Sequence, residues 1–168
     1  MGVVAITSCI QGASENDAVR AQEAIARVSH QLEPGAQFAA EIRQAGRSRS
    51  RYDWVVGQET TSVPPTGLDR EDLLLVISAV QVRWSVREHS GILVNPRIAL
   101  AVEANCSVQR AADGAVLYMH HFVETSPRYK YTTWGANGGR RLLSEWPALR
   151  KRLAKRMVQE SFQAKTHA

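Results

Sequence analysis

The chain has 168 residues and a mass of 18.6 kDa, a size typical of one domain that can bury a core without disulfides or structural metals. Apolar residues make up 44% and charged residues 22% of the sequence, which excludes a disordered chain and a coiled-coil rod. The net charge of +5 is uneven, because residues 1–84 carry 8 basic and 10 acidic side chains whereas residues 85–168 carry 13 and 6. No segment reaches the roughly 18–20 apolar residues of a membrane span.

The N-terminus contains a cysteine in a notable setting. Ile6-Thr7-Ser8-Cys9 resembles a bacterial lipobox, in which a branched residue and two small residues precede a cysteine that receives lipid. The apolar run before Cys9 is about five residues long, shorter than the ~7–15 residues of a signal peptide, so an ordinary cysteine is the alternative. We expect residues 1–13 to form a tail, which the lipobox interpretation makes the remnant of a signal, and residues 14–168 to form a single domain.

Two helices are predicted in the first third of the chain. Ser14 can accept hydrogen bonds from the first turn of a helix, and Asp17 places an acid there. Glu33-Pro34-Gly35 ends this helix, and a second helix is predicted over residues 36–45. The apolar residues at helical spacing are Ala21, Ile25, Val28 and Leu32 in the first helix and Phe38, Ala39 and Ile42 in the second.

Several segments are predicted to be strands. Residues 52–56 are rich in residues that favour extended backbone. Residues 73–86 begin with five consecutive apolar side chains, which predicts that both faces are covered there, and then alternate between apolar and polar side chains. Residues 98–108 alternate in the same way, and residues 116–123 continue after a turn.

Asp113-Gly114 is a strong hairpin signal between the last two of these strands. If the two residues form the whole loop, Ala112 lies opposite Ala115, and Cys106 lies opposite His121. Met119 then faces the core together with Val123, whereas a slip of one residue would turn both outward. The sequence therefore predicts that Cys106 and His121 are cross-strand neighbours.

The C-terminal segment is predicted to be a long amphipathic helix that follows a polar and aromatic connection over residues 125–139. Pro147 interrupts the helical pattern, so we expect a kink near Trp146. The apolar stripe consists of Leu142, Trp146, Leu149, Leu153, Met157, Val158 and Phe162.

Few residues are arranged for chemistry. His120 and His121 are adjacent in a predicted strand, so their rings point to opposite faces. Cys106 and His121 could supply two metal ligands, but zinc requires three or four, and a thiol beside a histidine at the edge of the core is the alternative. The sequence assigns no catalytic residue, metal ligand or cofactor, and we expect a protein that is not an enzyme.

The connection before the C-terminal helix combines cations, aromatic rings and glycines. Interleaved cations and rings are typical of single-strand nucleic-acid binders, and glycines before a helix can expose N–H groups to an anion. A turn capped by Asn137 and a solvated basic face are the alternatives. The candidate binding surface consists of Arg128, Tyr129, Lys130, Tyr131, Trp134, Arg140 and Arg141.

Three segments carry a resemblance to a known group: residues 91–100, residues 109–122 with their Ala111-Ala112-Asp113-Gly114 turn, and residues 129–158 with Trp134 and the following glycines. In this order they resemble uncharacterised proteobacterial envelope lipoproteins. More loosely, residues 70–165 are similar to the small α/β domains of TolB's N-terminal region and of curli-secretion and transport-auxiliary lipoproteins. The resemblance implies a location in the periplasm or at the outer membrane, with a lipid anchor, and carries no catalytic residues.

We therefore expect an α+β fold in which a mainly antiparallel sheet of three or four strands is packed by N-terminal and C-terminal amphipathic helices. The expected function is that of a non-enzymatic envelope lipoprotein or assembly accessory that binds other envelope proteins and contacts the membrane only through lipid on Cys9. The protein would be cytoplasmic if Met1 is its true start. The alternative function is a polyanion-binding or nucleic-acid-binding module that uses the basic second half.

Overall fold

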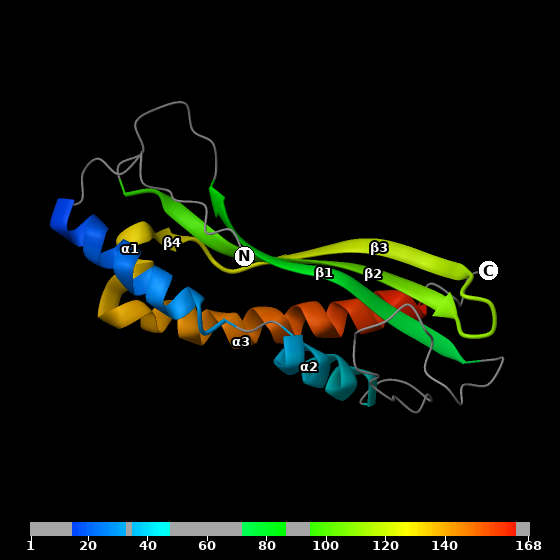
Figure 1. Cartoon of the computed structure of the whole chain (residues 1–168). Coiled ribbons are helices and arrows are strands. Elements are labelled where there is room, and N and C mark those ends of the chain that lie inside the picture. Colours follow the sequence, from blue (N-terminus) through cyan, green and yellow to red (C-terminus); the bar gives the residue numbers. More distant parts are fainter. Residues whose placement is uncertain (1–14, 33–34, 48–71, 87–94, 164–168) are drawn as a thin grey trace. The chain divides into compact units, whose positions relative to one another are not determined.

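A computed structural model describes residues 15–32, 35–47, 72–86 and 95–163 (Figure 1). Cys9, the expected tail, Ser14 and the strand predicted over residues 52–56 lie outside the described residues. The elements, in chain order, are α1 (Glu15–Ser29), α2 (Gly35–Arg47), β1 (Leu73–Val86), β2 (Arg97–Arg110), β3 (Val116–Thr125), β4 (Tyr129–Lys130) and α3 (Tyr131–Gln163).

The described strands form a four-stranded antiparallel sheet. β2 lies between β1 and β3, and β4 pairs with the beginning of β2, where Ile98 lies opposite Tyr129. Helices near both ends of the chain pack against this sheet, which confirms the predicted α+β fold. No described helix combines the length and the hydrophobicity needed to cross a membrane.

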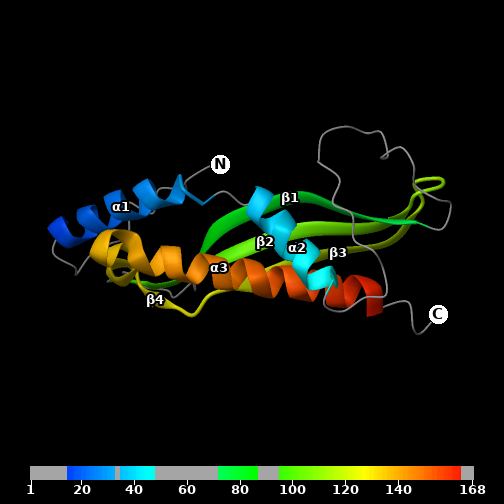
Figure 2. The ribbon, with the colours of Figure 1, turned by 90° about the horizontal axis from the view of Figure 1, so that it is seen from below.

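Residue contacts divide the chain into two compact units. Unit 1 contains α1, the ends of β1 and β2 at residues 82–86 and 97–101, β4, and α3 as far as Leu149. Unit 2 contains α2, the remaining parts of β1 and β2, β3 as far as Glu124, and α3 from Arg150. Within each unit the helices cover one face of the strands (Figures 1 and 2). The boundary between the units is not visible in the composition of the sequence. It passes through β1, β2 and α3, each of which contributes residues to both units.

The core of unit 1 forms where α1 meets the beginning of α3. Ala21, Ile25 and Val28 of α1 are buried, as the helical spacing predicts. Trp134 of α3 is fully buried, and its Nε1–H donates to the carbonyl oxygen of Ile98 at 3.0 Å. This bond fixes the first turn of α3 against β2.

The core of unit 2 is built on β2. The buried side chains on its helix-facing side are packed by α2 and by the second half of α3, so α2 is anchored through its predicted inward residues Phe38 and Ile42. Ala39, which was predicted to point inward with them, is only half-buried. The buried residues of the two longer elements are Val102, Ala104, Cys106 and Val108 of β2 and Leu153, Ala154, Met157 and Val158 of α3.

The predicted kink near Trp146 is wrong. The helical path is broken instead from Ala136 to Gly139, where Asn137 and Gly138 have φ angles of 51° and 67°. These angles lie in the left-handed region that glycine and asparagine tolerate best. Pro147 is accommodated inside the helix, because the carbonyl that its missing N–H leaves unbonded belongs to the exposed Leu143.

The prediction that the first half of β1 is covered on both faces is also wrong. Leu73, Leu74, Leu75 and Ile77 are only half-buried, and Val76 is 37% exposed. β1 is the outer strand beside β2. A continuous apolar run is therefore compatible with a half-exposed edge strand, because β-branched and leucine side chains also favour extended backbone there.

The predicted hairpin register is wrong, because β3 turns the opposite set of side chains toward the helices. Arg110 N donates to the carbonyl oxygen of Ala115, and Gly114 N donates to that of Arg110, both at 2.9 Å, so four residues lie between Arg110 and Ala115. Asp113 holds this longer turn by accepting hydrogen bonds from the side chain of Arg110 and from Ala115 N. The side chains of β3 nevertheless face the other way from the prediction, because Phe122 is fully buried whereas Met119 is 75% exposed.

Candidate protein-binding surface

The aromatic part of the predicted binding surface lies inside unit 1. Trp134 is fully buried and Tyr131 is 5% exposed, and burial raises the pKa of the Tyr131 hydroxyl. Trp84 and Tyr129 each place a ring edge-on to Trp134, at centroid distances of 5.1 and 5.4 Å. These rings form part of a core cluster, and neither Trp134 nor Tyr131 is available to stack on a ligand.

Tyr129 is partly exposed and is held by charged neighbours. Its hydroxyl donates to Glu145 Oε1 at 3.0 Å, and this hydrogen bond is the main cause of its raised pKa. The guanidinium of Arg141 lies 4.4 Å from the centre of the Tyr129 ring and 3.9 Å from Glu145. Tyr129, Arg141 and Glu145 therefore satisfy one another, which leaves Tyr129 little freedom to meet a partner.

The remaining cations of the predicted surface are exposed. Arg128 donates from Nη1 to the carbonyl oxygen of Ser85 at 3.1 Å and from Nη2 to the Ser85 hydroxyl at 3.3 Å, so it joins its loop to β1. Lys130 and Arg140 are exposed. Arg128, Lys130 and Arg140 are thus exposed, whereas the rings of Tyr131 and Trp134 lie in the core.

The glycines before the long part of α3 have a packing role. A Cβ atom on Gly135 would lie 2.2 Å from the Cα of Ala21, and one on Gly139 would lie 2.9 Å from a methyl group of Val28. Gly135 and Gly139 thus allow α1 to approach α3 at backbone distance. Asn137 and Gly138 carry the turn itself through positive φ angles.

Cys106 and His121 lie on opposite faces of the sheet, contrary to the predicted pairing. The Cys106 thiol is buried 3.5 Å from the Ser161 hydroxyl of α3, and burial raises its pKa although the hydrogen bond with Ser161 opposes the shift. His121 lies on the other face, 3.4 Å from Glu103. A raised pKa and a closed surrounding keep the thiol protonated, which is the opposite of an activated nucleophile.

His120 points to the helix side, away from His121, as the strand geometry predicts. Its ring lies 4.6 Å from that of Phe122 and 6.1 Å from that of Tyr118. Phe122 is buried beneath Arg156, whose guanidinium lies 5.8 Å from its ring centre. Among the described residues, no group of three or more His, Cys, Asp or Glu side chains could hold a metal ion.

The outer edge of β3 is one of the two open edges of the described sheet in unit 2. β3 pairs with β2 on one side, and no described strand pairs with it on the other. Backbone N–H and C=O groups along such an edge can pair with an added strand. We call the outer side of residues 116–124 the β3 edge.

Exposed apolar side chains accompany the β3 edge. Leu117 and Met119 project from the sheet face opposite α3 and are 39% and 75% exposed, and Val116 at the beginning of the strand is 56% exposed. On the same face, β2 presents the polar side chains of Asn105 and Ser107. The exposed apolar surface of this hairpin is therefore confined to the strand that also has unpaired backbone groups.

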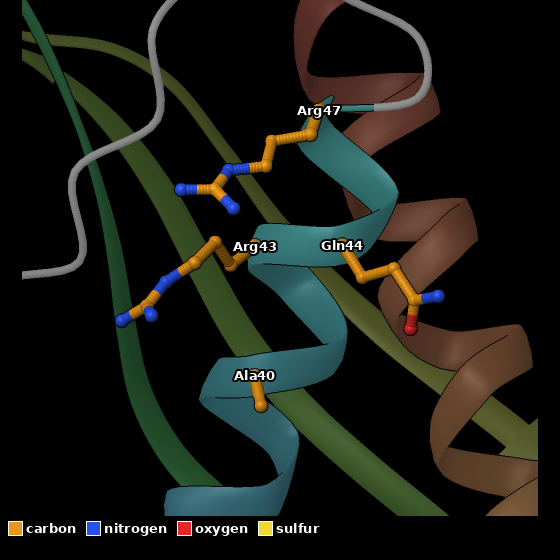
Figure 3. A pocket seen from close by; sticks show the side chains of 4 residues that line it. All are labelled: Ala40, Arg43, Gln44 and Arg47. Atoms are coloured by element: carbon orange, nitrogen blue, oxygen red, sulfur yellow. The ribbon is translucent and has the colours of Figure 1, made fainter.

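A second surface feature of unit 2 lies on α2. A shallow hollow of about 450 Å³ is lined by Ala40, Arg43, Gln44 and Arg47. Figure 3 shows that the arginine side chains extend to one side of the helix, whereas Gln44 extends to the other. All four side chains are exposed.

Sequence reasoning missed both surface features. It assigned Met119 to the core because the two-residue loop placed it there. The signal for the correct face was that the aromatic residues Tyr118 and Phe122 share one face of the strand and Met119 lies on the other. The hollow on α2 could have been found from Ala40, Arg43 and Arg47, which recur at the spacing of one helix face.

The chain matches no protein-family model, and it matches no curated protein sequence.

Proposed function

We propose that this protein is a non-enzymatic binding module of the bacterial envelope that captures an extended segment of another protein along the β3 edge. The observation that carries the proposal is the coincidence, on one strand, of an unpaired edge with Leu117 and Met119 exposed. Strand addition uses these two features together, because main-chain bonds supply affinity and alternate side chains supply specificity.

The shape of the apolar surface favours an extended partner. The apolar side chains follow a single strand, whereas the neighbouring β2 presents polar groups on the same face. A folded partner that packed on the whole face would bury Glu103 and Asn105 of β2, and buried polar groups require hydrogen-bond partners. A strand added beside β3 would leave these β2 side chains in water.

The envelope location and the lipid anchor on Cys9 rest on the sequence. The support is the Ile6–Cys9 segment and the resemblance over residues 70–165. Mass spectrometry of the N-terminal peptide of the native protein tests the anchor: we expect a diacylglycerol-modified cysteine, and an unmodified Cys9 within a longer peptide would remove the anchor from the proposal.

The polyanion alternative has less support. It depended on rings interleaved with cations, and Tyr131 and Trp134 are buried. The described acidic residues of the second half also lie within 4 Å of a basic group, which reduces its free positive charge. These contacts are Glu103–His121, Arg110–Asp113, Arg152–Glu124, Arg141–Glu145 and Arg156–Glu160.

Site-specific photocrosslinking in cells tests the β3 edge directly. A photoreactive amino acid replaces Met119 in one variant and Leu143 in a control, because Leu143 is also an exposed apolar residue and lies on α3 in unit 1. We expect a discrete adduct with one protein from position 119 and none from position 143. The adduct should disappear when Leu117→Lys is added, because a charged side chain would oppose burial of the strand pair.

Two results would contradict the proposal. Equal adduct yields at positions 119 and 143 would indicate random collision, and the absence of any adduct at position 119 would show that the edge is not occupied in cells. Circular dichroism of each variant confirms that the fold is retained, which is expected because both side chains are exposed.

A further inference from the structure

The described arginines of unit 2 fall into two groups. Arg110, Arg150, Arg152 and Arg156 each lie within 4 Å of a carboxylate. By contrast, no hydrogen bond or ion pair joins Arg43 or Arg47 to another described residue, and both line the hollow on α2.

Arg43 and Arg47 are placed to act together. They are four residues apart on α2, so their side chains are neighbours on one face of the helix. Figure 3 shows both guanidinium groups extending to the same side. Like charges at this spacing repel each other, and a bridging anion would turn this repulsion into attraction.

The other faces of α2 are already used. Phe38 and Ile42 point into the core, and Glu41 pairs with Arg150 of α3 at 3.2 Å. Ala40 lies one turn before Arg43, and its small side chain leaves the space that forms the hollow. The face with the two unpaired arginines is therefore separate from the face that holds α2 in place.

We propose that Arg43 and Arg47 bind a phosphate monoester group in the hollow on α2. Two guanidinium groups carry a charge of +2, which matches the roughly −1.5 to −2 of a phosphate monoester at neutral pH. Their planar N–H donors fit phosphate oxygens in pairs. A carboxylate offers one charge and two oxygens, so it would leave one arginine unsatisfied. This site is independent of the β3 edge and of the function proposed for it.

Titration with inorganic phosphate, followed by NMR or calorimetry of the full chain, tests the site. We expect weak saturable binding to the native protein, with a Kd of about 1 mM, and at least a tenfold loss in the variant R43Q/R47Q. The variant R43K/R47K keeps the charge without the planar donors and should bind less tightly than the native protein. Acetate should bind more weakly than phosphate to all of them.

A matched control separates the site from general attraction. The variant K130Q/K155Q removes two exposed positive charges from other places and should retain phosphate binding. If this control loses as much affinity as R43Q/R47Q, or if phosphate does not bind the native protein at tens of millimolar, the site does not exist.

Vesicles identify the source of the group. Vesicles of phosphatidylcholine with phosphatidic acid present a lipid phosphate monoester, whereas phosphatidylcholine alone does not. Binding to the mixed vesicles that is lost in R43Q/R47Q would assign the site to a lipid headgroup. Phosphate binding without vesicle binding would assign it to a soluble phosphate monoester.

Discussion

Single residues explain why the segment from Trp134 to Gly139 has so little sequence freedom. Trp134 donates a hydrogen bond to Ile98, and Gly135 has no side chain that would collide with Ala21. Asn137 adopts a left-handed backbone conformation. From sequence this segment looked like a glycine-rich surface turn. The reason for Gly135 and Gly139 lies in α1, more than a hundred residues earlier in the chain, so local patterns could not reveal it.

Gly135→Ala should be strongly destabilising. The added methyl group would collide with the backbone of α1 at Ala21, so α1 and α3 would have to move apart, at a cost of about 3 kcal/mol. Gly138→Ala is the matched control: no atom lies within 4 Å of its added methyl group, and its positive φ costs about 1 kcal/mol. Urea denaturation measures both changes, and equal losses would contradict the close approach of α1.

Cys106 should react slowly with thiol reagents in the folded protein. Its side chain is 1% exposed and burial raises its pKa, so labelling requires the surrounding structure to open. In a Cys9→Ser background, Ser161→Ala should speed labelling about fivefold, because loss of their contact destabilises the closed state by about 1 kcal/mol. Immediate labelling of the folded protein would show that Cys106 is accessible.

At the scale of elements, α2 is attached to α3 by one buried polar cluster. Arg150 is 5% exposed and contacts both Glu41 and the Gln37 side-chain oxygen. The sequence gives no sign that Arg150 is buried, because arginine is rarely buried. The pairing of Arg150 with a carboxylate on α2 could not be seen without the tertiary structure.

Arg150→Met should destabilise the protein by about 3 kcal/mol, because it leaves the Glu41 carboxylate without its cation in a poorly solvated place. The double variant E41Q/R150M should recover much of this loss, since no charge then remains buried. Arg152→Met, at an exposed arginine on the same helix, is the control and should change stability by less than about 1 kcal/mol. Thermal or urea denaturation of the four proteins decides between these outcomes.

Glu41 also gives a pH dependence with a definite sign. Desolvation by burial raises its pKa above 4.5, although Arg150 and Lys151 oppose the shift. The folded state therefore keeps this proton to a higher pH than the unfolded chain does. The resulting contribution to stability is fully present below 4.5 and is lost as the pH rises through the folded pKa.

The comparison with Glu41→Gln isolates this effect. The free energy of unfolding of the native protein relative to this variant should decrease between about pH 4 and pH 7. The Glu41 pKa, followed by carboxyl NMR, should rise further in Arg150→Met because the opposing charge is removed. A difference that increased with pH would mean that attraction to Arg150 outweighs desolvation.

At the scale of the whole molecule, β2 is the buried strand of both units. Its residues 98–102 are all at most 1% exposed, whereas the described side chains of β1 beside it are half-buried or exposed. Strand alternation predicted the extent of β1, β2 and β3 well. It did not predict which strand is central, because an apolar run is compatible with either position.

Hydrogen exchange followed by mass spectrometry should rank the strands accordingly. We expect peptides from β2 to exchange most slowly and peptides from the first half of β1 to exchange faster, because exposed hydrogen bonds open at lower free energy. Equal protection of β1 and β2 would contradict the edge position of β1. Hydrogen exchange of the variant Gly135→Ala should become faster in α1 before it becomes faster in the other elements.

The charge asymmetry of the sequence has a different meaning after folding. The basic second half supplies cations that pair with the acids beside them, and Arg150 instead pairs with Glu41 of the first half. Among the described arginines of unit 2, the two that stay unpaired, Arg43 and Arg47, come from the less basic first half of the chain. The net charge of a sequence segment therefore does not indicate where the unpaired arginines lie.

The sequence by itself determined the helices, the strands and the α+β class, because hydrophobic periodicity and turn residues act over short distances along the chain. Only the tertiary structure decided the face of β3, the burial of Tyr131 and Trp134, and the reason for Gly135. Each of these depends on contacts between residues far apart in sequence. Phe122 of β3 is buried beneath Arg156 of α3, and a ring lies inside or outside the core according to what packs above it.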